Sequence, residues 1–346
     1  MKSSSRFIFV AALCACTSSA FANGCIAVRS TSNLTIDMDD RHESKAGQTE
    51  FTSSYRYLYS DRHFRGKEEE KNRQAEGSDV RNRINTVDFT FSYWINNDWR
   101  ISASLPYITA HRSSLYEHDR VNRHVMTAEG VGDLRLMAYR TYEGDMDSIS
   151  GFTWGVGVKL PTGKEDVQDI AYRPTGPEVR YVDQSIQLGD GGTGLIAELQ
   201  AYTQMFGERT FGFVTLSYLF NPEDTNGVST NPTRAQSEHS IPDSYQTRFG
   251  ISSLLSDAWS YDVAIRAEGV PPEDVFGDSN GFRRPGYAIY LEPTVNWRSG
   301  AHRLNISVPW AIERNRVQSV SDRMTGGHGD AAFADYLLMT SYSYQW

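Results

Sequence analysis

Charged residues of both signs recur at alternate positions in segments whose other positions are apolar. Asp133 and Arg135 are two residues apart, and Lys159 follows Val156 and Val158 in a second such segment. Side chains two apart share one face of a β-strand, so these charges gather on one side. On an enclosed face they must pair or stay hydrated, because an isolated buried charge is costly. Alternation places ten candidates on this face: Asp133, Arg135, Lys159, Glu198, Arg248, Asp262, Arg266, Glu292, Arg303 and Asp335.

A second pair with chemical potential is His111 and Ser113, which alternation places on the apolar, outward side near Asn85. A base that activates a hydroxyl nucleophile in this position is what an outer-membrane phospholipase needs. Such a motif continues with Asn-Gly, and the neighbouring Arg112 and Ser114 do not match it. We therefore expect no enzymatic activity.

Other sites for metals or cofactors have weak support. The histidines at 111, 118 and 124 lack the regular spacing of a zinc site and indicate a solvated loop. The glycine-rich stretch 189–194 opens a predicted strand, which favours a bend at a rim over a phosphate cradle. The stretch 157–164 has one residue too many for a P-loop and lacks the following Ser or Thr. We expect no metal and no cofactor.

The segment 331–346 shows the clearest alternation in the chain. From Tyr336 onward its even positions are Tyr, Leu, Thr, Tyr, Tyr and Trp. Alternation over roughly 10 residues matches a tilted strand that crosses a bilayer. The aromatic end, Tyr342, Tyr344 and Trp346, is the predicted membrane-insertion signal, which the barrel-assembly machinery would recognise.

The same pattern recurs along the chain and predicts an all-β fold, an antiparallel transmembrane β-barrel of twelve strands over residues 49–346. A soluble sandwich is the alternative fold. Phe211 and Phe213 compete with Val214 and Leu216 for the lipid face, which predicts a bulge. The predicted strands are 49–60, 84–95, 99–109, 132–142, 150–160, 193–205, 210–220, 245–255, 259–268, 286–297, 302–313 and 332–346.

Short turns alternate with long polar loops between these strands. Outer-membrane barrels have short periplasmic turns and long extracellular loops, so both termini are predicted to be periplasmic. Loops this long without a pattern of their own would be unusual in a soluble domain. The short turns are near 96–98, 143–148, 206–209, 256–258 and 298–301, and the long loops are near 61–80, 110–130, 162–192, 221–244, 269–285 and 314–331.

Two interpretations of the charged inner face stay open. It is either a salt-bridged network that holds the barrel round or a polar pore lining that selects solutes. Twelve strands lie between the filled eight-stranded barrel and the open sixteen-stranded porin, so we expect a narrow passage. We also expect Asp133 and Lys159 to pair near the extracellular rim, where Arg135 makes the wall locally positive.

The N-terminus predicts export. Residues 1–22 have a basic start, an apolar stretch and an A-x-A cleavage site, as in a secretory signal peptide. Residues 23–48 are then a periplasmic or plug segment. Loss of Lys2 and Arg6 changes the formal charge from −9 to −11, which argues against nucleic acid as a partner. Of the cysteines at 14, 16 and 25, only Cys25 stays in the mature chain, so no internal disulfide is expected.

Mean hydropathy is −0.50 although 12% of the residues are aromatic, which suits a barrel with a wet lumen and aromatic girdles. Three segments carry a family resemblance: 130–136 (GVGDLRL), 157–163 (GVKLPTG) and 189–195 (GDGGTGL), preceded by 104–107 (SLPY). Together they resemble the outer-membrane transporters grouped as the phenol-degradation MetA-pathway family. That resemblance implies a shared barrel and the passage of small aromatic or hydrophobic molecules, and it transfers no binding residue. The expected partners are outer-membrane lipid, lipopolysaccharide and an unknown small solute.

Overall fold

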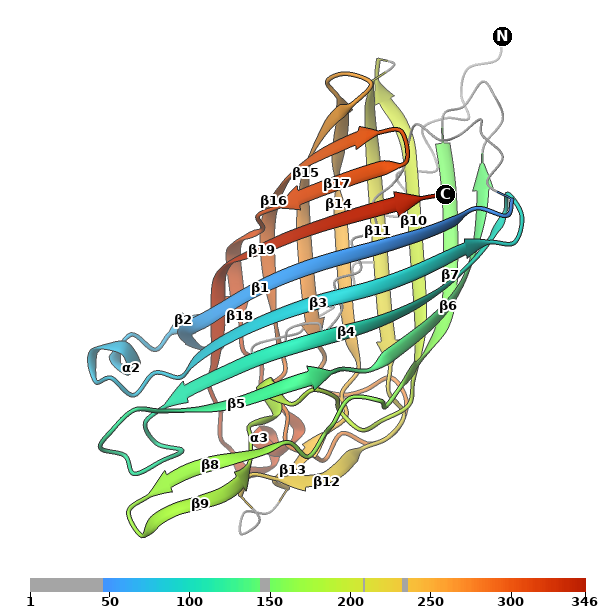
Figure 1. The fold of residues 1–346 in the computed structure, drawn as a ribbon. Helices are drawn as coiled ribbons and strands as arrows, with labels where there is room; N and C mark the ends of the chain where they lie inside the picture. Colours follow the sequence, from blue (N-terminus) through green and yellow to red (C-terminus); the bar gives the residue numbers. More distant parts are fainter. Residues whose placement is uncertain (1–45, 144–149, 208, 232–235) are drawn as a thin grey trace.

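The computed structural model describes residues 46–143, 150–207, 209–231 and 236–346. The predicted signal peptide and most of the predicted 23–48 segment lie outside the described residues, as does most of the predicted 143–148 turn. The described residues form one closed antiparallel β-barrel with connections of unequal length (Figure 1). None of their helices has the length and apolar character needed to cross a membrane.

The barrel wall has twelve strands when each interrupted strand is counted once, as predicted. β5 and β6 both pair with β4, and β17 and β18 both pair with β16, so each couple is one strand with a break. β1 (Thr49–Arg65) pairs with β19 (Ala331–Gln345), which closes the ring. The other wall strands are β3 (Arg81–Trp94), β4 (Trp99–Ser114), β5 (His124–Val131), β6 (Leu134–Glu143), β7 (Ser150–Leu160), β10 (Gly194–Phe206), β11 (Thr210–Phe220), β14 (Ser244–Leu254), β15 (Trp259–Val270), β16 (Gly286–Ser299), β17 (His302–Ser307) and β18 (Trp310–Asn315).

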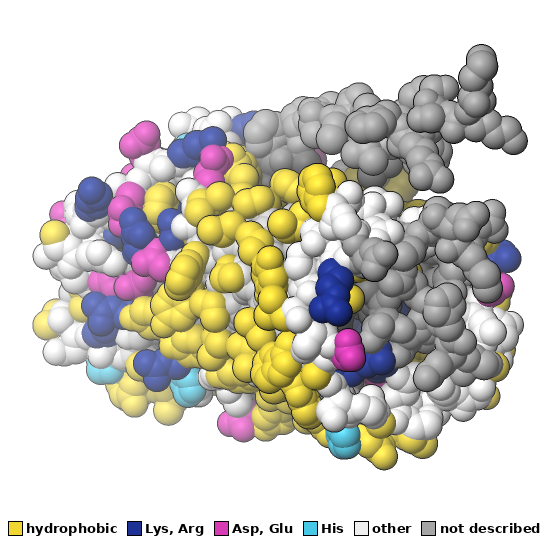
Figure 2. Space-filling view, turned by 90° about the horizontal axis from the view of Figure 1, so that it is seen from above, with side chains coloured by type: hydrophobic (Ala, Val, Ile, Leu, Met, Phe, Trp, Pro, Cys, Tyr) yellow, Lys and Arg dark blue, Asp and Glu magenta, His cyan; other side chains and the backbone are white. Residues whose placement is uncertain are grey.

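Apolar side chains cover the outer wall because alternate residues of each strand point outward. Phe89 and Phe91 of β3 are 45% and 47% exposed, whereas Asp88 between them is 5% exposed. Figure 2 shows apolar side chains gathered across the barrel surface between groups of charged ones. An apolar outer band around a polar interior is the arrangement of a barrel that lipid surrounds.

The hairpin of β4 and β5 is longer than predicted. The predicted loop 110–130 is wrong over most of its length, because β4 continues to Ser114 and β5 begins at His124. Pro106 keeps β4 in unbroken register with β3. On the other side the partner strand breaks at Gly132, whose N–H donates to the carbonyl of Pro106 at 2.8 Å. Proline has no N–H to donate to a neighbouring strand, so regular pairing cannot continue on both sides of it. The break at Gly132 provides the irregular pairing on one side.

The bulge predicted between 211 and 218 is also wrong. β11 pairs with β14 without interruption from Thr210 to Leu219, and the nearby irregularity lies in β10 between Gln204 and Phe206. Phe211 and Phe213 are 0% and 8% exposed and face the interior. Alternation alone did not decide which face these two aromatic rings occupy. In the structure they fill part of the lumen.

The two ends of the barrel differ as the alternation of turns and loops predicted (Figure 1). The end with the short turns also holds the C-terminus, and the opposite end carries the long connections. These connections have structure of their own, unlike the patternless loops expected from the sequence. They contain β2 (Glu68–Glu69), α2 (Asn72–Ala75), β8 (Gln168–Arg173), β9 (Gly176–Tyr181), η2 (Gln184–Ile186), β12 (Thr225–Ser229), β13 (Glu238–Ser240) and α3 (Val320–Thr325).

Candidate functional site in the barrel lumen

A buried ion pair inside the barrel joins two strands that are not neighbours. Arg56 lies on β1 and Glu268 on β15, and three wall strands separate them. The Nη2 atom of Arg56 nevertheless lies 2.6 Å from Oε1 of Glu268, and both side chains are buried. Side chains of strands separated by three others therefore meet inside the barrel.

Three further charges extend this pair into a network. Glu292 accepts a hydrogen bond from Nε of Arg266 and lies 2.8 Å from Nη2 of Arg248. Arg266 also lies 3.8 Å from Glu268. All five residues come from wall strands, and we call Arg56, Arg248, Arg266, Glu268 and Glu292 the central cluster. Removing one partner would leave a buried charge uncompensated, so the cluster constrains the barrel.

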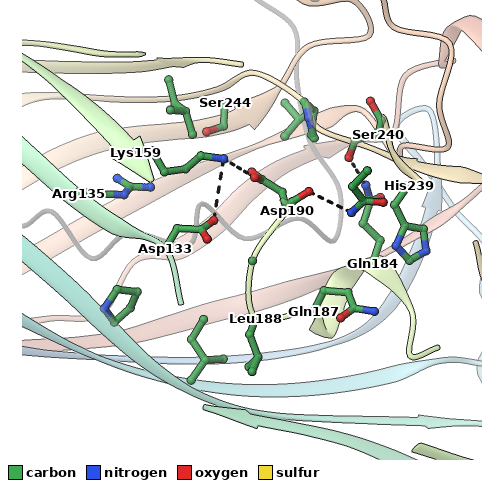
Figure 3. Close-up of a pocket in the computed structure, with 17 residues that line it drawn as sticks. Asp133, Arg135, Lys159, Gln184, Gln187, Leu188, Asp190, His239, Ser240 and Ser244 are labelled. Atoms are coloured by element: carbon green, nitrogen blue, oxygen red, sulfur yellow. Dashed lines mark hydrogen bonds and ion pairs between the residues drawn. The ribbon is translucent and has the colours of Figure 1, made fainter. Parts of the chain in front are cut away.

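A second group of charges lies where wall strands meet the long connections. Figure 3 shows its side chains. Lys159 of β7 is 2% exposed, and its Nζ contacts Oδ1 of Asp190 and lies 3.9 Å from Oδ2 of Asp133. Asp133 lies at the break between β5 and β6, and Asp190 belongs to the connection before β10. We call Asp133, Lys159 and Asp190 the rim cluster. Arg135 lies directly opposite Lys159 in the register of β6 and β7.

The connection between β9 and β10 turns into the barrel, and we call residues 182–190 the inner loop. Val182, Ile186 and Leu188 are buried with Ile108 and other apolar residues of β4 and β5. The side-chain amide of Gln184 donates to the carbonyl of Ser240 at 2.8 Å. Apolar burial and hydrogen bonding thus hold the inner loop against the wall.

Asp183 anchors the inner loop through charge. Its two carboxylate oxygens accept hydrogen bonds from Nη1 and Nη2 of Arg284 at 2.9 and 2.7 Å, and Nη1 of Arg112 lies 3.5 Å from Oδ1. Burial alone would raise the pKa of Asp183, but Arg112 and Arg284 hold that pKa well below its usual range. The carboxylate therefore stays charged throughout the physiological pH range.

A cavity of about 40 Å³ lies between the rim cluster and the inner loop. That volume holds a few water molecules. Its walls combine the charges of Asp133, Arg135, Lys159 and Asp190 with apolar side chains (Figure 3). The apolar wall comes from Pro106, Ile108, Leu188, Leu219, Pro242 and Val270. Such a cavity suits a molecule with one charged end and an apolar body.

The other predicted inward residues divide into two groups. Three have polar partners inside the wall: Glu198 accepts a hydrogen bond from Tyr139 at 2.9 Å, Asp262 accepts one from Asn296 at 3.2 Å, and Arg303 donates to Glu50 at 2.9 Å. Asp335 differs from these three, because its side chain is 50% exposed. It lies beside a shift in the register of β1 and β19 and pairs with Arg62 and Arg314.

The sequence analysis missed the residues that the inner loop contributes. Asp183, Gln184 and Asp190 lie in a loop without periodicity, so alternation says nothing about them. The one available signal was the dense glycine around Asp190, since small residues allow a loop to approach a wall closely. The expected pair of Asp133 and Lys159 is present at 3.9 Å, but the direct contact of Lys159 is with Asp190.

Two of the three loop histidines lie together. The rings of His118 and His124 are 5.1 Å apart, whereas His111 lies on the exposed side of β4. Nδ1 of His118 accepts a hydrogen bond from the N–H of Tyr172 at 3.1 Å, so the neutral ring carries its proton on Nε2. A metal ligand through Nε2 needs the opposite tautomer. Burial and the neighbouring His124 lower the pKa of His118, which further favours the neutral ring.

His111 and Ser113 both lie on the outward-facing side of β4, as expected. Across the strand pair with β3 they face Arg83 and Arg81. Asn85 is engaged elsewhere, since it accepts a hydrogen bond from Tyr55 and donates one to Thr109. Within the described part of the chain, no hydrogen bond is found between His111 and Ser113.

The closed wall and its apolar outer band define a transmembrane β-barrel of the outer-membrane type. No family model matches the sequence, so the resemblance to the MetA-pathway family is not confirmed. The crystal structure of an outer membrane channel from Pseudomonas putida F1 is similar, with a TM-score of 0.58 and 14% identity over 90% of this chain and all of that chain. At this identity the similarity shows the fold alone.

Two other solved barrels are less similar. The toluene transporter TodX of P. putida has a TM-score of 0.42 and 9% identity, over 87% of this chain and 90% of that chain. A FadL homologue from Pseudomonas aeruginosa has a TM-score of 0.41 and 9% identity, over 89% and 91%. These scores are too low to support a statement about this chain.

Proposed function

We propose that this protein is an outer-membrane channel for small solutes with an apolar body. The observation that supports the proposal most strongly is the cavity beneath the inner loop, which combines apolar walls with charged groups inside a barrel of the outer-membrane type. A narrow lumen with fixed charges selects solutes by size and by local field. The aromatic or hydrophobic solutes that the sequence resemblance implied fit the apolar wall.

Planar lipid bilayers test this proposal. Purified full-length protein should produce small conductance steps, because the central cluster and the inner loop narrow the lumen. Folding of the sample is checked by the different migration of unheated and boiled protein on a denaturing gel. Silence from protein that shows this shift, together with no uptake of a hydrophobic solute by vesicles, would contradict the proposal.

A structural or adhesion barrel with a closed lumen is the second candidate. The central cluster favours it, because buried ion pairs occupy part of the lumen and join wall strands without any solute. A variant that weakens the central cluster distinguishes the two candidate functions. In a channel, Arg56→Ala should enlarge the conductance steps, whereas in a closed structural barrel it should lower stability and leave the bilayer silent.

We propose transport in preference to catalysis, and an assay for lipid hydrolysis tests that choice. A silent bilayer combined with hydrolysis of phospholipid that disappears in Ser113→Ala would favour an outer-membrane phospholipase. The engaged side chain of Asn85 and the arginines opposite His111 and Ser113 argue for no hydrolysis.

We propose that residues 1–22 direct export and are removed, that 23–48 form a periplasmic or plug segment, and that lipid and lipopolysaccharide surround the barrel. The aromatic end of β19 would serve the barrel-assembly machinery. Trp346 exchanges backbone hydrogen bonds of 2.9 Å with Thr49, and its ring stacks on Tyr344. Deleting Trp346 should lower the amount of heat-modifiable protein in the outer membrane. Unchanged assembly, or recovery of the wild type as soluble periplasmic material, would contradict this proposal.

A further inference from the structure

The contact between Lys159 and Asp190 joins a fixed residue to one on a glycine-rich segment. Lys159 lies within the paired strands β6, β7 and β10. Asp190 lies between Gly189 and Gly191, and Gly192 follows. Gly191 has a φ of +86°, a conformation that glycine adopts without strain. The cation is therefore held on a paired strand, and the anion is held on a connection outside the strands.

The barrel wall at Lys159 presents two neighbouring cations to the cavity. Lys159 and Arg135 are direct cross-strand neighbours, and like charges in that position repel each other. Both line the cavity, and a carboxylate beside them relieves the repulsion. Asp190 provides the nearer of two carboxylates, because its Oδ1 atom contacts Nζ of Lys159, whereas Asp133 lies 3.9 Å from Nζ. The same Oδ1 atom accepts a hydrogen bond from the N–H of Gly192 at 3.0 Å.

The rest of the cavity wall combines apolar side chains with uncharged polar ones such as Gln184 and Ser240. Ile108, Leu188 and Leu219 line it together with Lys159. A molecule that satisfies both parts of the wall has a carboxylate at one end and an apolar body at the other. The present cavity of about 40 Å³ admits only the end of such a molecule while Asp190 is in place.

We propose that Asp190 occupies the binding site for the carboxylate of the transported solute, and that a small monocarboxylate with an apolar body replaces Asp190 on Lys159. The proposal rests on the proposed function and names its solute class. One carboxylate replaces another, so the buried ammonium of Lys159 keeps a partner throughout. The segment around Asp190 then leaves the lumen, and the solute itself opens the passage.

Binding of benzoate to the purified full-length protein, measured by calorimetry, tests this exchange. Asp190→Asn removes the competing charge with little change of shape and should tighten benzoate binding by about 10-fold, because binding no longer has to displace the internal carboxylate. Lys159→Met should abolish it. Asp166→Asn is the matched control, because Asp166 lies in the same connection and pairs with the exposed Lys164 at 3.4 Å, and it should leave affinity unchanged. Benzamide, the neutral probe, should show no gain in Asp190→Asn.

A measurement on the wild type covers the case in which a variant fails to fold. Benzoate should speed hydrogen exchange at the N–H of Gly192, which Asp190 now protects, and benzamide should not. Equal gains for benzoate and benzamide, benzoate binding that survives in Lys159→Met, or exchange at Gly192 that ignores benzoate would each overturn the proposal. Bilayer conductance is independent of these readouts, so benzoate binding to a silent barrel would contradict the channel and leave the exchange site intact.

Discussion

The central cluster and the rim cluster both consist of buried ion pairs, but their residues come from different parts of the fold. Every residue of the central cluster comes from a paired wall strand, and Arg56 and Glu268 meet across three intervening strands. In the rim cluster, Lys159 and Asp133 also belong to the wall, but Asp190 comes from the glycine-rich end of the inner loop. Buried ion pairs within one lumen thus either join wall strands to each other or join the wall to a connection.

This difference predicts where a lost partner is tolerated. A charge in the central cluster has nowhere to move, so its loss leaves the remaining charges buried and unpaired. A charge in the rim cluster can be relieved by movement of the inner loop. The predictions below test that contrast in order of decreasing effect.

Glu292→Ala should have the largest effect on stability. It leaves Arg248 and Arg266 without their shared carboxylate and should lower the free energy of unfolding by about 3–5 kcal/mol. Urea denaturation of protein reconstituted in vesicles measures this. Glu70→Ala, which removes the partner of the half-exposed Arg65, is the control and should change stability by less than about 1 kcal/mol. Equal losses in the two variants would show that the central cluster does not constrain the barrel.

Asp183→Asn should loosen the inner loop, with a loss of stability between those of the other variants. It removes charge from the contacts with Arg112 and Arg284 and should cost about 1–3 kcal/mol of loop docking. Faster proteolysis within residues 161–193 and larger conductance steps would report the loosening. If the variant is as resistant to protease as the wild type, apolar burial alone holds the inner loop.

The pH dependence of loop docking follows from the same carboxylate. The pKa of Asp183 is lower in the folded protein than in the unfolded chain, so its contribution is present above the unfolded pKa of about 3.9. This contribution to loop docking is lost as the pH falls through the pKa that Asp183 has in the folded protein. Protease resistance of the inner loop should therefore be constant from neutral pH down to about pH 5. A steep loss at pH 6 to 7 would point to a histidine instead.

Lys159→Glu should have the smallest effect on stability and a clear effect on selectivity. It places three carboxylates together, but movement of Asp190 relieves the repulsion, so we expect a loss of about 1–2 kcal/mol. The preference of the channel should shift toward cations, as reversal potentials in asymmetric salt will show. A cysteine at position 159 that reacts with lipid-phase probes and not with water-soluble ones would place this residue outside the lumen.

The wall was predictable from the sequence because its signal is local. Alternation gave twelve strands, the lipid-facing side of Phe89 and Phe91, and the inward side of Lys159, Arg266 and Glu292. Where the register is irregular, the same rule says less. Asp335, beside the shift between β1 and β19, is half-exposed, and β4 and β5 pair beyond the predicted strand ends on the other side of the break at Gly132.

The rim cluster was predictable only in part. Asp133 and Lys159 follow from strand parity, whereas Asp190 reaches them through a connection whose path depends on tertiary packing. Val182, Ile186 and Leu188 draw that connection inward by burial against β4 and β5. The spacing of these three residues gives no sign of that burial, because a loop packed against the wall has no regular alternation of apolar residues. The partner of Lys159 was therefore visible only in the folded chain.

The central claim is that the lumen is a passage narrowed by the inner loop. Its most direct test compares single-channel conductance of the wild type with that of a variant in which residues 164–191 are replaced by a short Gly-Ser linker. Both proteins must first show the heat-dependent gel shift of a folded barrel. We predict small steps for the wild type and larger, steadier steps for the variant. Silence from both folded proteins would contradict the claim and leave a closed structural barrel.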